Sequence, residues 1–209
     1  LIPDRTLFVG THHKAGTVWL QTIFTEICRR HGLTMCVCSR SDTPDDGCDV
    51  IFNYHSVFDS GYKMKSYRGL HMIRDPRDMI VSGCFYHQTA DEWWLFKPFN
   101  RLGGSTYHDK INSFDNLDDK LLLEMEIIAP TAISDMVSWN YQEPSFFELK
   151  YEQLIIDTKL ELFRKLFTFL GFADHMIPGL LEIGYANSMF SRDYSNPKHI
   201  RSGATLLWR

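Results

Sequence analysis

The sequence has no apolar run of the about 18 residues that a membrane-spanning helix needs, so we predict no membrane span. It also lacks an excess of positive charge, because 22 Lys and Arg stand against 26 Asp and Glu, a net charge of −4. Nucleic acid is therefore not an expected partner, since general nucleic-acid binding needs a basic surface. A small anionic ligand stays compatible, because a local basic pocket can form inside an acidic protein.

Cysteine is sparse and odd in number, with five residues. No Cys-x-x-Cys pair accompanies a pair of histidines, so we predict no metal site. Cys36 and Cys38 would point to one face of a strand and not bridge easily. We therefore expect free thiols in a reducing compartment. The first residues also lack the charged-then-apolar pattern of a secretory signal, and together these features predict a cytoplasmic protein.

The remaining composition is that of a globular protein. Hydrophobic residues make up 44% and charged residues 23% of the 209 positions, which excludes a disordered chain. Domains usually hold roughly 100–200 residues, so we expect a single domain over residues 1–209. A core of this size buries about 70% of the unfolded chain's surface and needs no covalent staple.

Short apolar segments alternate with amphipathic ones. Each apolar segment is continuous, as in strands that are buried on both faces of a parallel sheet. Asp75-Pro76 is typical of a helix start, and Gly32 and Gly171 of helix ends. The order predicts a three-layer α/β, P-loop-like domain with a central parallel sheet of about five strands. The predicted strands are 6–9, 34–38, 50–54, 70–73 and 147–151, and the predicted helices are 20–28, 76–86, 118–128, 132–141 and 162–170, with Pro130 between two of them.

Residues 91–118 interrupt this alternation and are too long for an ordinary connection. They carry aromatic residues, among them Trp93, Trp94 and Phe99, between glycines and polar groups. We interpret the segment as a candidate lid or insertion over a substrate site, although aromatic side chains also simply pack.

The loop from Gly10 to Thr17 has the features of an anion site. It joins a predicted strand to a predicted helix, so that backbone N–H groups and the helix dipole favour a phosphate there. Lys14 adds a full charge and Thr17 a hydroxyl donor. The pattern differs from the nucleotide-triphosphatase loop, because Lys14 precedes Gly16 instead of following it. A loop that only caps a helix, with Lys14 solvated, is the alternative.

Arg74 suggests a second anion contact. It stands at the carboxyl end of a predicted buried strand, where parallel sheets bind their ligands. A guanidinium there can clamp a phosphate, and Ser82, about two helical turns on, can add a hydroxyl. The alternative is a surface Arg–Asp pair.

Together these segments resemble the sulfotransferase family that uses 3′-phosphoadenosine-5′-phosphosulfate (PAPS). The segment from Lys14 to Trp19 is similar to the family's K-[ST]-G-[TS]-T-W, and that from Arg74 to Ser82 to its R-[DN]-x-x-D-x-x-x-S. His55 stands 19 residues before Arg74, close to the family's catalytic histidine. Similar matches are Phe85-Tyr86-His87, Ser138-Trp139, the segment from Leu149 to Leu154 around Tyr151, and Arg201-Ser202-Gly203 for R-K-G.

The resemblance implies in-line transfer of a sulfuryl group from PAPS to a hydroxyl or amine of a small-molecule acceptor, for which we expect an aromatic or apolar molecule. His55 would be the base, with His12, His13 and His87 as rival candidates for that role, and Lys14 would stabilise the leaving 3′-phosphoadenosine-5′-phosphate (PAP). No metal is implied, and the sequence specifies no oligomeric state. The resemblance assigns co-substrate binding to Lys14, Ala15, Gly16, Thr17, Val18, Trp19, Arg74, Ser82, Tyr151, Arg201, Ser202 and Gly203.

Some positions depart from the family pattern. Ala15 and Val18 replace hydroxyl residues, Asn53 stands where many members carry a lysine, and Ser202 replaces a lysine. Two other functions therefore stay open. A P-loop kinase or nucleotide hydrolase would need a hydroxyl residue directly after the loop lysine and an acidic strand end. A non-catalytic nucleotide-binding scaffold would tolerate the departures.

Overall fold

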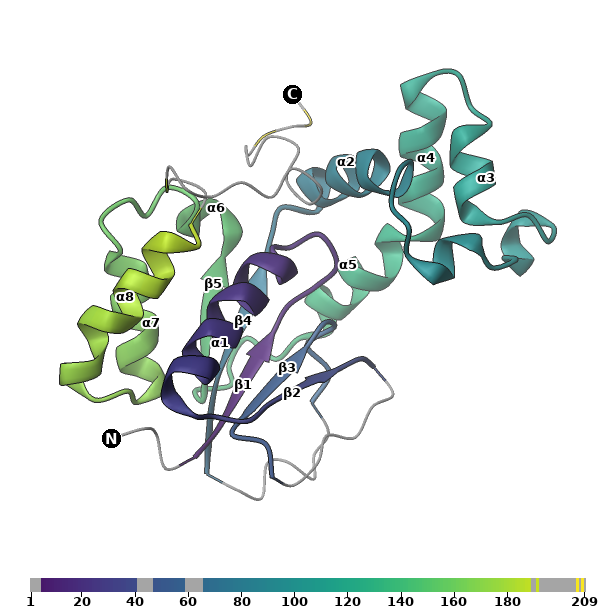
Figure 1. Ribbon diagram of the computed structural model, residues 1–209. Helices are drawn as coiled ribbons and strands as arrows, with labels where there is room; N and C mark the ends of the chain where they lie inside the picture. The colour runs from purple at the N-terminus through teal and green to yellow at the C-terminus, as the bar shows by residue number, and fades with distance from the viewer. Residues whose placement is uncertain are drawn as a thin grey trace.

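The computed structural model describes residues 5–40, 47–58, 66–188, 191, 206 and 208. Five strands form one parallel sheet in the order β2-β3-β1-β4-β5 (Figure 1). The predicted α/β fold with a central parallel sheet is confirmed. The strands are β1 (Thr6–Gly10), β2 (Met35–Cys38), β3 (Val50–Asn53), β4 (Tyr67–Ile73) and β5 (Phe146–Lys150).

The central strand β1 determines where the site forms. Its last residue, Gly10, lies opposite Asn53 of β3 and His71 of β4. Because parallel strands end at the same edge, the segments that follow β1, β3 and β4 come together there. A side chain at Gly10 would not fit, since a Cβ there would lie 2.7 Å from the hydroxyl of Ser56.

One face of the sheet is covered by three helices, α1 (Thr17–His31), α7 (Glu161–Leu170) and α8 (Ile177–Ala186) (Figure 1). Their apolar stripes pack on strand residues such as Val9, Phe52 and Met72. Two glycines end α1 and α7, Gly32 with φ 66° and Gly171 with φ 91°, as the sequence predicted. The sequence did not predict α8. Two short helices, α6 (Tyr151–Leu154) and η4 (Asp174–Met176), precede α7 and α8.

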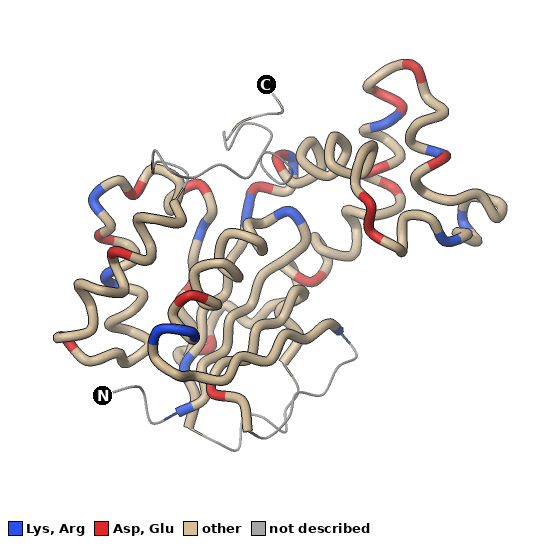
Figure 2. The backbone as a smooth tube through the Cα atoms, viewed as in Figure 1, with Lys and Arg blue, Asp and Glu red and all other residues tan. Residues whose placement is uncertain are grey.

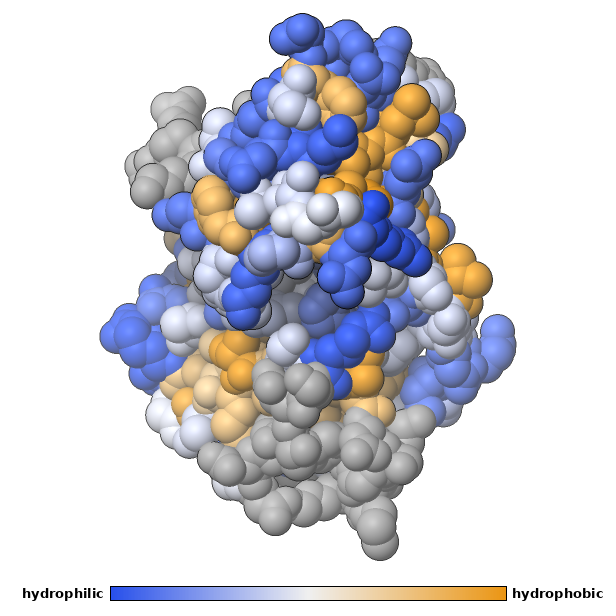
Figure 3. All heavy atoms as spheres, turned by 90° about the vertical axis from the view of Figure 1, so that its right-hand side faces the viewer, coloured by the Kyte–Doolittle hydropathy of each residue, from blue (hydrophilic) through white to orange (hydrophobic). Residues whose placement is uncertain are grey.

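The remaining helices lie on the other side of the β1–α1 loop and extend beyond the carboxyl edge (Figure 1). They have a small core of their own around Leu95, Tyr107 and Ile111. Figure 3 views this side and shows hydrophobic residues reaching the surface in separate groups among hydrophilic ones. These helices are α2 (Pro76–His87), η2 (Trp93–Phe96), η3 (Asn100–Leu102), α3 (Tyr107–Asn112), α4 (Leu117–Ile127) and α5 (Ala129–Ser138).

Charges of both signs are intermixed along the chain in Figure 2. Among the described residues, no helix combines the length and the apolar character that crossing a membrane requires.

Three sequence predictions need correction. Pro130 lies in the first turn of α5 and not between two helices, because the first turn needs no hydrogen bond from that nitrogen. Tyr151 begins α6 and does not extend the last strand. Cys36 and Cys48 form a disulfide, so these two are not free thiols, and the argument for a reducing compartment falls. Their Cα atoms lie 5.8 Å apart, because the segment before β3 runs beside β2.

Candidate functional site

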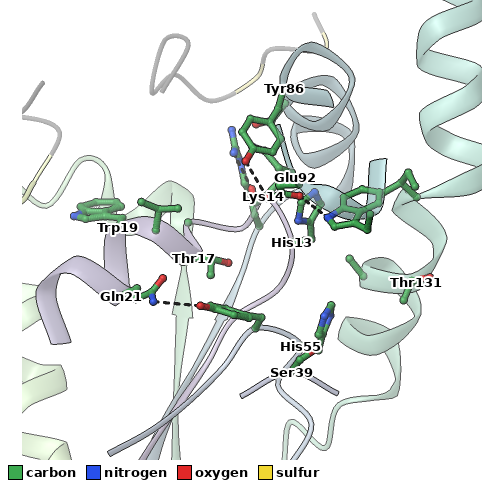
Figure 4. Close-up of a pocket in the computed structure, with 18 of the residues that line it drawn as sticks. His13, Lys14, Thr17, Trp19, Gln21, Ser39, His55, Tyr86, Glu92 and Thr131 are labelled. Carbon is green, nitrogen blue, oxygen red and sulfur yellow. Dashed lines mark hydrogen bonds between the residues drawn. The ribbon is translucent and has the colours of Figure 1, made fainter. Parts of the chain in front are cut away.

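A cavity of about 850 Å³ lies at the carboxyl edge of the sheet, between the β1–α1 loop and the helices beyond it (Figure 4). This volume is in the range of about 300–1,000 Å³ that small-molecule sites occupy. Residues from several separate segments of the chain line the cavity. The sequence-predicted residues among them are Lys14, Gly16, Thr17, Val18, Trp19, His55, Arg74, Ser82 and Tyr151.

Among the described residues, one predicted residue does not line the cavity, and three further predicted residues cannot be placed. Ala15 is fully buried and packs with Met79 and Met136, so its side chain belongs to the core. Arg201, Ser202 and Gly203 lie outside the described residues.

Two residues further along the chain contact the start of α2. The backbone N–H of Leu206 donates to Asp78 at 2.8 Å. The guanidinium of Arg77 lies 3.6 Å from the ring centroid of Trp208.

The β1–α1 loop turns sharply through two residues in the left-handed region, Lys14 with φ 62° and Gly16 with φ 98°. A Cβ on Gly16 would lie 2.7 Å from Cε of Met72. Gly16 is also the N-cap of α1, where no side chain accepts a hydrogen bond and no acidic residue occupies the first turn. The helix therefore presents its N-terminal N–H groups without a side-chain acceptor, which favours an anion.

The ammonium group of Lys14 lies inside this site. Its Nζ is 3.4 Å from the ring centroid of Tyr86. Burial, with Arg74 nearby, lowers the pKa of Lys14 to about 8, while the carboxylate of Glu92 acts in the opposite direction. Glu92 is held in place by the hydroxyl of Tyr86 at 2.9 Å and the indole N–H of Trp94 at 2.6 Å. With this pKa, Lys14 carries its charge at pH 7 and loses it as the pH rises past about 8.

Arg74 ties the two predicted anion contacts together. It follows β4, is only 8% exposed, and donates from Nη1 to the carbonyl of Lys14 at 3.0 Å. Its guanidinium lies 4.2 Å from the ring centroid of Tyr151. Trp19 packs edge-on against Tyr151, and its buried indole N–H has no hydrogen-bond partner within the described part of the chain. A bound polar ligand would supply that partner.

His55 stands in the turn after β3. Its backbone N–H donates to the side chain of Asn53 at 2.9 Å, and the Asn53 amide donates to Val57 at 2.9 Å. Asn53 therefore shapes the turn and does not reach the cavity as a lysine would. Burial, together with the charge of Arg40, lowers the pKa of His55, so its imidazole is neutral at pH 7. Its Nδ1 is buried without a hydrogen-bond partner among the described residues.

Two further histidines, His12 and His13, follow one another in the loop, and each begins a chain of hydrogen bonds. His13 contacts His87 at 2.8 Å between Nε2 atoms, and His12 contacts His71 in the same way at 2.8 Å. His13 lines the cavity, whereas His12 is fully buried and is not among the lining residues.

The sequence missed several lining residues. Trp93, Trp94 and Phe99 of the predicted insertion do line the cavity. Nothing in the sequence distinguished Glu92, whose role depends on the fold bringing it to Lys14. The other lining residues that no motif indicated are Gln21, Ser39, Tyr54, Ile127, Ile128, Thr131 and Ala132.

Within the described part of the chain, no group of three or more His, Cys, Asp or Glu residues is arranged to hold a metal ion. The site combines two cations, an uncapped helix N-terminus, aromatic walls and neutral histidines. Such a site can bind a phosphorylated aromatic molecule and accept a proton beside it.

Neither a protein-family model nor a curated protein sequence matches this chain. Among solved structures it is similar to mouse sulfotransferase SULT7A1 complexed with PAP, at 15% sequence identity and a TM-score of 0.63. The match covers 99% of this chain and 78% of that chain. At this identity the likeness concerns the fold, so the chain has the P-loop-like α/β fold of a sulfotransferase.

Proposed function

We propose that this chain is a sulfotransferase, which moves the sulfuryl group of PAPS to a hydroxyl or amine of a small-molecule acceptor. The observation that carries the proposal is the pair formed by Lys14 and Arg74. Both line one cavity beside the uncapped N-terminus of α1, and Arg74 donates a hydrogen bond to the carbonyl of Lys14. Two anionic groups of one molecule would find separate cations there, as the two phosphates of PAP require.

The co-substrate would lie along the carboxyl edge. Lys14 and the segment from Gly16 to Val18 would hold the 5′-phosphosulfate, and Arg74 with Ser82 the 3′-phosphate. Trp19 and Tyr151 would contact the adenine, and the unpaired indole N–H of Trp19 supports a polar ligand atom at that end. The family resemblance adds Arg201, Ser202 and Gly203 to the 3′-phosphate side.

The reaction needs charge stabilisation more than covalent help, as in phosphoryl transfer. The acceptor oxygen attacks sulfur in line while the bond to the 5′-phosphate oxygen breaks. Lys14 stabilises the charge on that leaving oxygen, and such a preorganised donor is typically worth about 100- to 1,000-fold in rate. His55, neutral and turned toward the cavity, takes the acceptor's proton.

The acceptor would lie on the side of the cavity that is lined by Trp93, Trp94, Phe99, Ile127 and Ile128. These side chains favour an aromatic or apolar molecule. Residues 91–118 would then act as the lid over the acceptor, within a single domain of 209 residues.

The two other functions make different demands. A kinase or nucleotide hydrolase needs a hydroxyl for magnesium after the loop lysine, but Ala15 is there and its side chain is buried. A non-catalytic scaffold is favoured by Asn53, which supplies no cation at the cavity.

One experiment separates these functions. Calorimetry compares the binding of PAP with that of ATP and magnesium, and radiolabelled PAPS is then offered with 2-naphthol or 2-naphthylamine. Tighter binding of PAP and labelled product support the sulfotransferase. Binding of PAP without transfer to any acceptor in a broad panel supports the scaffold, and preference for ATP with magnesium supports the kinase.

A further inference from the structure

A chain of three side chains leads from the cavity into the protein interior. It begins at His13 in the β1–α1 loop, passes through His87 at the end of α2, and ends at Glu124 on α4. Nε2 of His13 lies 2.8 Å from Nε2 of His87, and Nδ1 of His87 lies 2.8 Å from Oε2 of Glu124. His87 is fully buried and Glu124 is 1% exposed, so solvent does not screen this chain.

The carboxylate at the inner end fixes the protons on both rings. Glu124 accepts the hydroxyl of Tyr107 at 2.6 Å and the Nδ1–H of His87 on the same oxygen. A neutral His87 then has a lone pair on Nε2, so His13 must donate its own Nε2–H. Nδ1 of His13 is left as a hydrogen-bond acceptor on the residue that lines the cavity.

The backbone of α2 is adapted to this carboxylate. A Cβ on Gly83 would lie 2.3 Å from Oε1 of Glu124, so only glycine leaves room for the carboxylate where it stands. Three elements, α2, α3 and α4, therefore converge at one buried acid two rings away from the cavity, which is more than packing requires.

A second chain with the same chemistry provides an internal comparison. Nε2 of His12 contacts Nε2 of His71, and Nδ1 of His71 contacts Glu148 at 2.8 Å. The first ring of this chain, His12, is fully buried, and its Nδ1 has no hydrogen-bond partner among the described residues. Only the chain that begins at His13 opens on the cavity.

We propose that His13 is a second catalytic base at this cavity, with His87 and Glu124 as positioning residues; this rests on the proposed function and extends it. On this route the acceptor's oxygen bonds to sulfur as the sulfur–oxygen bond to PAP breaks, and its proton moves to Nδ1 of His13 instead of to His55. The Nε2 proton of His13 then shifts to His87, which becomes an imidazolium beside Glu124. The relay later returns one proton to water, so that atoms and charge balance.

The surroundings explain why the proton needs this relay. Burial, His87 and Lys14 hold the pKa of His13 well below its usual value, so the ring is neutral and holds an added proton only weakly. A cation left on His13 would be repelled by Lys14 next to the leaving group. Moving the charge to His87 places it against the carboxylate of Glu124, while Glu92 and Tyr86 remain around the lysine.

The first test reads the protons directly and does not depend on turnover. Nitrogen NMR of the ring-labelled full chain, with and without PAP, assigns the tautomer of each histidine. We expect His13 with its proton on Nε2 and His87 with its proton on Nδ1. A proton on Nδ1 of His13 overturns the proposal.

The second test uses transfer from radiolabelled PAPS to 2-naphthol and 2-naphthylamine. His13→Gln and Glu124→Gln should each lower the turnover number by about 10- to 100-fold, below the full range of general-base effects because His55 remains. The affinity for PAP and the KM for PAPS should stay within about twofold of the wild type. Glu124→Gln keeps a side-chain oxygen that accepts from His87. The tautomers of His13 and His87 therefore stay the same, while the negative charge of the carboxylate is lost.

Glu148→Gln is the matched control, because it makes the same change in the hydrogen-bonded chain from His12 through His71 to Glu148, whose first ring does not line the cavity. Its turnover should equal that of the wild type, with thermal unfolding measured for all variants. An equal loss of turnover in Glu124→Gln and Glu148→Gln overturns the proposal. Wild-type turnover in His13→Gln also overturns it. If the wild type binds PAP but sulfates no acceptor in the broad panel, the proposed function fails, and the tautomers alone then decide whether the relay exists.

Discussion

His55 is the residue whose substitution separates binding from chemistry. It lines the cavity with a buried Nδ1 that has no hydrogen-bond partner among the described residues, and its proposed role concerns the acceptor and not the phosphates. His55→Ala should therefore leave PAP affinity nearly unchanged and lower sulfuryl transfer by about 100-fold, within the general-base range. Calorimetry and a transfer assay measure the two quantities.

Lys14→Ala is the informative comparison, since Lys14 would contact the co-substrate before and during transfer. It should weaken PAP and slow transfer together. Near-normal turnover in His55→Ala would remove His55 as the base and leave the sulfotransferase proposal standing on the phosphate contacts.

Lys14 also predicts a pH dependence of binding. A lysine carries its charge below its pKa, so with a pKa of about 8 the charge is lost as the pH rises past this value. The affinity for PAP should fall by up to about tenfold between pH 7 and pH 9, where the phosphates of PAP are already ionised. Lys14→Arg is the control and should bind PAP equally at both pH values, since arginine keeps its charge. A wild-type affinity that stays flat would mean that Lys14 does not contact the anion.

The sequence indicated some of the residues at the site and missed the carboxylates that support them. Lys14, Trp19 and Arg74 lie in segments with recognisable order along the chain, and all three line the cavity. Glu92 and Glu124 are single carboxylates in ordinary polar segments. Their importance arises only when folding places them against Lys14 and His87, which no local pattern encodes.

The β1–α1 loop makes a prediction at the scale of an element. Gly16→Ala places a side chain at φ 98° and 2.7 Å from Met72, whereas Gly104→Ala meets a similar φ of 89° with no atom within 4 Å. Gly104→Ala should lower the free energy of unfolding by about 1–2 kcal/mol, the cost of the left-handed backbone. Gly16→Ala should cost more and also weaken PAP. Equal losses in urea denaturation would show that the contact with Met72 relaxes freely.

Elements were predicted best where one local rule decides. Asp75 caps α2 by accepting the N–H of Arg77, as its position before Pro76 indicated. The helix α8 was hidden by Pro178, Gly179 and Gly184, all poor helix formers. In the fold Pro178 lies in the first turn and the apolar residues of α8 belong to the main core, so tertiary packing overrides propensity.

The Cys36–Cys48 disulfide affects the stability of the whole molecule. It links Cys36 in β2 to Cys48 just before β3, 12 positions further along the chain. Loop closure of this length stabilises a fold by about 3 kcal/mol. Substituting both cysteines by serine should lower the free energy of unfolding by about that amount, measured by urea denaturation. The variant should match the reduced wild type and no longer respond to reductant; continued sensitivity to reductant would contradict this pairing.

The global arrangement was only partly accessible from sequence. Continuous apolar strands between helices predicted a parallel sheet, and β1 to β5 form one. Their order in space, and hence which loops meet, is set by long-range packing. The cavity exists because β1 lies between β3 and β4, which brings Lys14, His55 and Arg74 to one edge.

Under the proposed function, Arg74 holds the 3′-phosphate of PAP at this cavity. The most direct measurement is calorimetry of PAP and of adenosine 5′-phosphate, which lacks that group, on the wild type, Arg74→Ala and Arg77→Ala. Arg77 is the control, since it lies three residues on, pairs with Asp75 and does not line the cavity. Loss of a charged hydrogen bond is worth about 1.5–3 kcal/mol, so Arg74→Ala should weaken PAP by about 10- to 150-fold and adenosine 5′-phosphate far less. Arg77→Ala should change neither. Equal weakening of both nucleotides by Arg74→Ala, or no weakening at all, would contradict the account.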